Sequence, residues 1–122
     1  MKRMLNVLLL ALVLGISVSA AELKANLTNK QVKALIAAAK TPEDHAALAR
    51  YYDQKADTLL AESKDHEEMA AAYRKNPMNS GSKFITNTVG HCEYFAKSDR
   101  EKAEKMKEMA AEHRAMAEAA GK

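Results

Sequence analysis

The sequence predicts an all-α protein, in which a short helix precedes two long helices that pack as an antiparallel hairpin. Three observations support this fold class. Residues 43–76 and 91–120 contain neither Gly nor Pro. Helix-start signals precede the first two expected helices. A stripe of alternating small and larger residues runs along each long stretch in steps of four and three, as in helices that pack side by side.

The first 20 residues have the features of a secretory signal peptide. Lys2 and Arg3 form a positive start, and residues 4–16 form an apolar run that is too short for a membrane span. Val18-Ser19-Ala20 suits cleavage after Ala20, and a cut one residue later fits equally well. We therefore expect a signal peptide at 1–20 and a single helical domain at 21–122, periplasmic or secreted, without stable membrane insertion after cleavage.

The charge of the mature chain excludes one class of partner. Loss of Lys2 and Arg3 with the leader lowers the formal net charge from +3 to about +1. A near-neutral surface with mixed signs gives no electrostatic footprint for nucleic acid.

Local signals set the expected helix bounds at 29–39, 42–74 and 91–120. Thr28 and Gln31 form a capping box before the first helix. Thr41 suits the cap of the second helix and Pro42 its first turn. Residues 83–90 are ambiguous, and we expect a loop there. Gly121 closes the third helix.

The two long helices resemble copies of one unit. A shift of 47 positions superposes Cys92 on His45 and His113 on His66. The phrase [His/Cys]-x-x-[Leu/Met/Phe]-Ala opens at each of these four residues, and its two copies in each helix lie three heptads apart. We therefore expect an internal repeat whose phrases share one helical stripe.

That stripe predicts an alanine-rich seam between the helices. Small residues at alternate positions let two helices approach closely, and a short connection makes them antiparallel. The expected register places His45 opposite His113 and His66 opposite Cys92. Because a lone hairpin of this composition buries little apolar surface, we expect a third helix or a second copy to cover it, and we favour a homodimer arranged as a four-helix bundle.

The paired ends of the hairpin are candidate transition-metal sites. One end would hold His45 and His113, and the other His66 and Cys92. Further candidate ligands are Met116 at the first end and Met69 and His91 at the second. Imidazole, thiolate and thioether suit copper, and the first two suit zinc.

Other interpretations remain open. Histidines at helix ends are often structural, and Met or Ala on a stripe is ordinary core material. No Cys-x-x-Cys-His motif is present for covalent haem, whereas paired histidines leave noncovalent haem open. Cys92 has a candidate base beside it, His91, but the two residues are adjacent on a helix and point about 100° apart, so that the histidine does not face the thiol. We therefore expect no enzymatic activity.

The phrases carry one resemblance. The chain resembles small uncharacterised exported helical proteins of bacteria (pattern TPxDH, HxxMA, HC, HxxMA). The resemblance rests on residues 41–49 with Tyr51 and Tyr52, His66 to Ala70, His91-Cys92, and His113 to Ala117. The resemblance covers most of the mature chain and implies an exported helical protein without an assigned activity. The expected function is non-enzymatic binding of copper or zinc. The alternative is a structural or chaperone-like protein with a partner in the envelope.

Overall fold

The computed structural model describes residues 26–76 and 83–122, with the side chains of 83–86 excepted. It is built from three helices, α1 (Asn29–Ala38), α2 (Pro42–Lys75) and α3 (Lys83–Ala120). The predicted signal peptide and the turn-rich residues 77–82 lie outside the described part. No helix within that part is long and apolar enough to cross a membrane.

The starts of α1 and α2 follow the predicted capping boxes. The Thr28 side chain accepts from the Gln31 amide, and the Gln31 side chain accepts from the Thr28 amide in return. At α2, Thr41 and Asp44 make the same reciprocal pair. Each box satisfies two amide groups that would otherwise have no partner within the helix. The predicted bounds of these helices agree with the structure to within one residue.

The start of α3 differs from the prediction. We expected a loop at 83–90, but the helix begins at Lys83 and includes Gly90. Glycine lowers helix propensity by only about 1 kcal/mol, and contacts with a neighbouring helix compensate for a penalty of that size. Val89 supplies such a contact, because it is buried against α2 beside Ala70. Gly90 is therefore tolerated within a packed helix.

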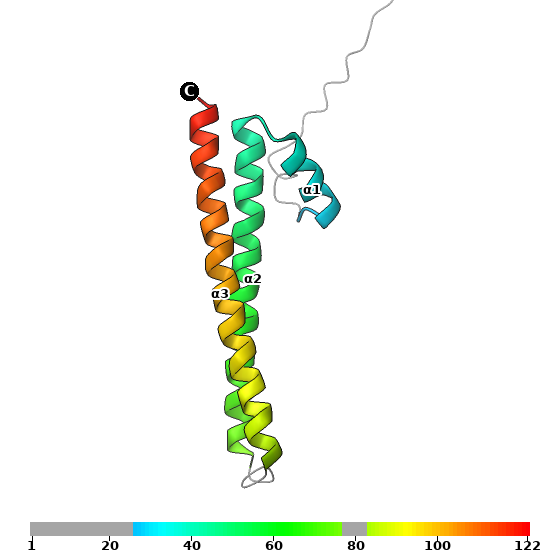
Figure 1. Cartoon of the computed structure of the whole chain (residues 1–122), viewed down its shortest axis with the longest axis vertical. Coiled ribbons are helices and arrows are strands. Elements are labelled where there is room, and N and C mark those ends of the chain that lie inside the picture. The colour runs from blue at the N-terminus through cyan, green and yellow to red at the C-terminus, as the bar shows by residue number, and fades with distance from the viewer. Residues whose placement is uncertain (1–25, 77–82) are drawn as a thin grey trace, which may run out of the picture.

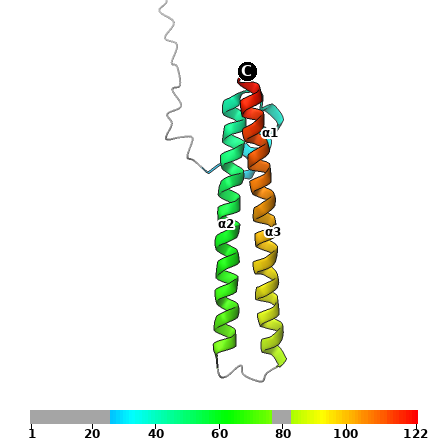
Figure 2. The ribbon, with the colours of Figure 1, turned by 90° about the vertical axis from the view of Figure 1, so that its left-hand side faces the viewer.

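Helices α2 and α3 lie side by side and antiparallel over their whole length (Figures 1 and 2). At 1.5 Å per residue they span about 50 Å and about 57 Å. The end of α3 returns to the start of α2, where Gly121 approaches Pro42. Below, we call this end of the hairpin the open end and the end that joins Lys75 to Lys83 the loop end.

The seam between α2 and α3 is lined by small residues, as predicted. Five alanines from the two helices are at most 3% exposed: Ala49, Ala56, Ala70, Ala96 and Ala103. Ala110 is completely buried and belongs to a larger cluster at the open end, where α1 brings Val32 against Leu48 and Tyr52. The short helix α1 therefore covers one side of the hairpin at its open end only (Figure 1).

Candidate functional site

Two imidazoles meet at the open end of the hairpin. His45 lies in the first turn of α2 and His113 in the last third of α3, and their Nδ1 atoms are 3.2 Å apart. Their rings are nearly parallel, with centroids 5.5 Å apart. In the metal-free protein one Nδ1 donates its hydrogen to the other, so that the two rings adopt different tautomers. The predicted pairing of His45 with His113 is confirmed.

The surroundings of His113 favour its neutral form. One face of its ring stacks on Tyr52, with ring centroids 5.6 Å apart and planes 8° from parallel. Burial, and then the nearby His45, lower the pKa of His113, whereas Glu112 acts weakly in the opposite direction. Neutral imidazole is the form that binds metal ions. His113 of the pair therefore packs on Tyr52 of the core, and the Nδ1 atoms of the two histidines point toward each other.

Of the two carboxylates directly adjacent in sequence to the pair, Asp44 is committed to the helix cap. Asp44 accepts hydrogen bonds from the amides of Lys40 and Thr41, which hold its pKa below the usual value of 3.8. Its carboxylate therefore stabilises the start of α2. We do not count it among the available metal ligands.

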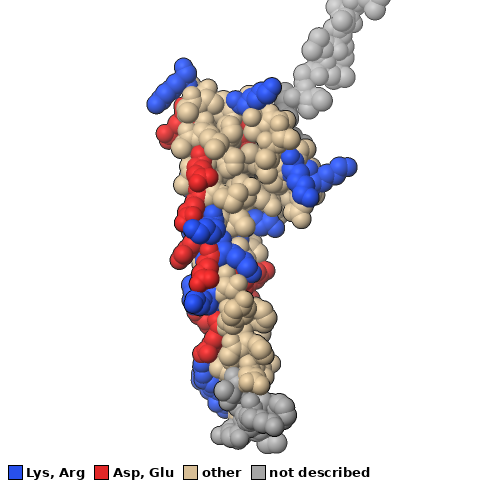
Figure 3. Space-filling view, viewed as in Figure 1, with Lys and Arg blue, Asp and Glu red and all other residues tan. Residues whose placement is uncertain are grey.

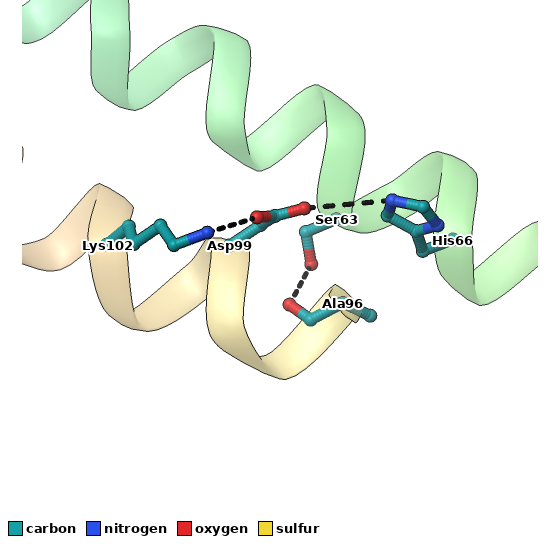
Figure 4. A network of polar contacts seen from close by, with 5 residues as sticks. All are labelled: Ser63, His66, Ala96, Asp99 and Lys102. Carbon is teal, nitrogen blue, oxygen red and sulfur yellow. Dashed lines mark hydrogen bonds and ion pairs between the residues drawn. The ribbon is translucent and has the colours of Figure 1, made fainter. Parts of the chain in front are cut away.

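At the loop end, His66 makes different contacts. Its Nε2 lies 3.8 Å from Oδ2 of Asp99 (Figure 4). Its ring also packs on Phe95 at a centroid distance of 5.3 Å. Its Nδ1 is buried and has no hydrogen-bond partner among the residues that the structure describes. Asp99 is also buried and lies 3.3 Å from Nζ of Lys102. The neighbour of the His66 ring is thus a carboxylate, whereas the neighbour of His113 at the open end is a second imidazole.

Cys92 does not join this network. The free cysteine is buried in an apolar cluster with Ala70 and Val89. The other two candidates near this end, Met69 and His91, are largely exposed. The structure therefore brings His45 and His113 together, but it does not bring His66 to a hydrogen bond with Cys92. The remaining candidate, Met116, lies one turn beyond His113 and is 45% exposed.

A serine, a histidine and an aspartate lie together in one place, which was not predicted from the sequence. Ser63, His66 and Asp99 form this group in the middle of the loop-end half (Figure 4). Ser63 is buried, and its Oγ donates a 2.7 Å hydrogen bond to the carbonyl of Ala96. A buried hydroxyl that donates to the backbone is not available as a nucleophile. The signal for this contact was present in the sequence, because both residues lie on the predicted stripe, Ser63 at a small position and Asp99 at a larger one.

The seam has two unlike flanks. On one flank, three ion pairs join α2 to α3: Asp53 to Arg114, Glu67 to Arg100 and Arg74 to Glu93. On the other, large apolar residues directly precede seam alanines: Leu48, Met69, Phe95, Met109 and Met116. We call this second set the apolar flank. Charged side chains run along one edge of the hairpin, and the surface below α1 is mostly uncharged (Figure 3).

This arrangement explains the repeated phrase physically. A residue three positions after a seam histidine or cysteine reaches the apolar flank, and the alanine that follows it returns to the seam. The phrase therefore meets the packing needs of the hairpin. A metal-binding function must rest on the geometry of individual side chains.

Within residues 26–76 and 87–122, whose side chains are described, no three His, Cys, Asp or Glu groups lie close enough together to hold a metal ion. The open end thus offers two ligands of these types. Comparisons of the chain with protein-family models, curated proteins and solved structures gave no match.

Proposed function

We propose that this is an exported, non-enzymatic helical protein that binds a transition metal ion, copper or zinc, through His45 and His113. One observation carries the proposal: the two Nδ1 atoms are 3.2 Å apart. Two nitrogen ligands of a tetrahedral ion at about 2.0–2.1 Å lie about 3.3 Å from each other. An ion bound to both atoms lies to one side of the line that joins them, so that each ring turns toward the ion while the two helices keep their present spacing.

The positions of the two histidines also favour a pre-arranged site. One comes from each helix of the hairpin, and the buried alanines of the seam hold the helices in register. Tyr52 fixes the plane of the His113 ring by stacking. Ligands held before the ion arrives lose little conformational entropy on binding.

The test is metal titration of mature, tag-free protein with Cu(I) and Zn(II), preceded by elemental analysis of the purified protein. We expect one equivalent of metal per chain and loss of binding in His113→Ala and in His45→Ala. The control is His91→Ala, because His91 is exposed in the same hairpin and lies far from the open end. Circular dichroism checks that each variant remains helical.

Two results would contradict the proposal. The first is a parent protein that takes up neither metal at micromolar concentration. The second is equal uptake by the parent and by His113→Ala, which would place any bound metal elsewhere.

A second candidate function, an interaction protein, is favoured by the apolar flank. Below α1 the flank carries Met69 and Phe95, each nearly half exposed, beside Tyr73 on the seam. The same side of the hairpin also carries Glu62 and Lys102, which have opposite signs. A two-fold interface must be self-complementary, so Glu62 of one copy can pair with Lys102 of the other, which also contacts Asp99 of its own chain. We therefore propose a second copy of this chain as the occupant, which gives a four-helix arrangement.

The mass in solution, measured by light scattering after size-exclusion chromatography, tests this candidate. We expect a dimer for the parent and a monomer for Phe95→Lys. Tyr94→Lys is the matched control, since Tyr94 is adjacent and more exposed but lies off the flank. A monomeric parent at high micromolar concentration, or a dimeric Phe95→Lys, would contradict a dimer through this flank.

A further inference from the structure

We propose that the metal bound at the open end is Cu(I), and that the thioethers of Met109 and Met116 complete its ligand set. This inference rests on the proposed function of the His45 and His113 pair. It adds a metal class and two ligands, one of which, Met109, was not among the residues predicted from the sequence.

The first argument is placement. Met109, His113 and Met116 are spaced by four and three residues, so that they form one row along α3. The two methionines lie one turn before and one turn after His113, on the apolar flank. Neighbours at these spacings have Cβ atoms about 5–6 Å apart, a separation that a flexible methionine side chain spans readily.

The second argument is exposure. Met109 is 37% exposed and Met116 is 45% exposed. Met106, one turn before Met109, packs against the cluster that α1 covers and serves the core. The two methionines beside His113 are thus less committed to packing than their neighbour, which leaves their flexible side chains free to turn toward an ion at the histidine pair.

The third argument is ligand chemistry. Thioethers are soft ligands that select Cu(I), whereas carboxylates favour harder ions. No third His, Cys, Asp or Glu side chain with a described position lies close enough to complete a zinc site with the pair. Asp44 is held by the amides of Lys40 and Thr41. Two imidazoles and two thioethers are therefore the ligand set that this end of the hairpin offers.

The loop end provides an internal control for the methionines. Met69 follows His66 at the same spacing as Met116 follows His113, and it is also 45% exposed. His66, however, faces Asp99 and Phe95 and has no second imidazole beside it. Met69 therefore occupies the same place in the phrase as Met116, but the histidine beside it is not paired with a second histidine.

The experiment compares Cu(I) and Zn(II) affinities of the full mature protein. Cu(I) is measured without oxygen by competition with a coloured Cu(I) chelator, and Zn(II) by competition with a zinc dye. The test variant is Met109→Leu with Met116→Leu, because leucine keeps the apolar volume and removes sulfur. The control is Met69→Leu.

We expect the double variant to bind Cu(I) roughly 10- to 100-fold more weakly, a loss of the size seen when groups that support a metal site are removed. Its Zn(II) affinity should equal that of the parent, and Met69→Leu should match the parent for both metals. X-ray absorption should show sulfur around copper in the parent and not in the double variant.

The outcomes separate the two proposals. Unchanged Cu(I) affinity in the double variant, with metal binding still dependent on His113, would overturn the methionine ligands and leave the histidine site in place. A parent that binds neither metal would overturn both. Equal losses of Zn(II) and Cu(I) affinity would also overturn the inference, because they indicate a structural effect of the substitutions.

Discussion

The two ends of the hairpin carry corresponding residues but differ in what covers them. Leu48 at the open end and Phe95 at the loop end are 47 positions apart and occupy the same place in the repeated phrase. Leu48 is 0% exposed because α1 packs over it, whereas Phe95 is 48% exposed. The ten-residue helix α1 thus buries this position of the phrase at the open end, whereas the same position at the loop end remains at the surface.

The same comparison separates the two histidine environments. His113 has an imidazole and a tyrosine ring as neighbours, and His66 has a carboxylate and a phenylalanine ring. In the predicted register Cys92 takes the place of His45, but its shorter side chain packs among apolar residues. Similar phrases therefore produce one end at which two imidazoles meet and another end at which the histidine contacts a carboxylate.

The largest expected effect is on stability, from shortening Leu48. Leu48→Ala should lower the free energy of unfolding by about 2–5 kcal/mol, the range for a fully buried leucine whose removal leaves a cavity. Chemical denaturation followed by circular dichroism measures the change.

The matched substitution at the loop end is Phe95→Ala. Because Phe95 is half exposed and its ring contacts the rings of His66 and Tyr94, we expect a loss of about 1 kcal/mol or less. These measurements use dilute, monomeric protein. Equal losses at Leu48 and Phe95 would show that the loop end is covered in solution as well, and would break the contrast between the ends.

A smaller effect is expected at the seam, which both ends share. Ala103 is 1% exposed between α2 and α3, and Ala103→Leu should destabilise the protein by about 1–3 kcal/mol through overpacking. Ala111→Leu is the control, since Ala111 is exposed on the outside of α3. If both substitutions have the same small effect, the close approach of the helices does not depend on alanine.

The seam and two of the three helices were predictable because their signals are local or periodic. Thr28 with Gln31, and Thr41 with Pro42, are local start signals that do not depend on tertiary contacts. The stripe of small residues fixes which faces meet. The start of α3 was not predictable, because Gly90 argues against a helix locally and the packing of Val89 on α2 is a tertiary contact.

The candidate site was predictable only in part. The register of the seam gave the meeting of His45 with His113, since both lie on the stripe at matching distances from the connection. It gave no side-chain direction, and so it missed that His66 contacts Asp99 and Phe95. It also gave no exposure, which is why Met109 was not recognised as a neighbour of His113 on an accessible flank.

The smallest expected effect is a loss of stability of the metal-free protein in mild acid, which originates at the open end. Burial and His45 lower the pKa of His113 in the folded state, so the unfolded chain binds more protons below its ordinary value of 6.5. The stabilising contribution is therefore fully present above pH 6.5 and is lost progressively as the pH falls below that value. Asp44 acts in a separate window, because its pKa lies below 3.8.

Thermal melts of metal-free protein at a series of pH values measure this effect. We expect the midpoint to fall between pH 6.5 and pH 5, and the fall to be shallower in His113→Gln, which keeps a polar side chain but does not titrate. His66→Gln provides the comparison with the loop end, where a carboxylate faces the imidazole. If the parent and His113→Gln lose stability in parallel, the acid sensitivity does not come from the histidine pair, and the two ends do not differ in this respect.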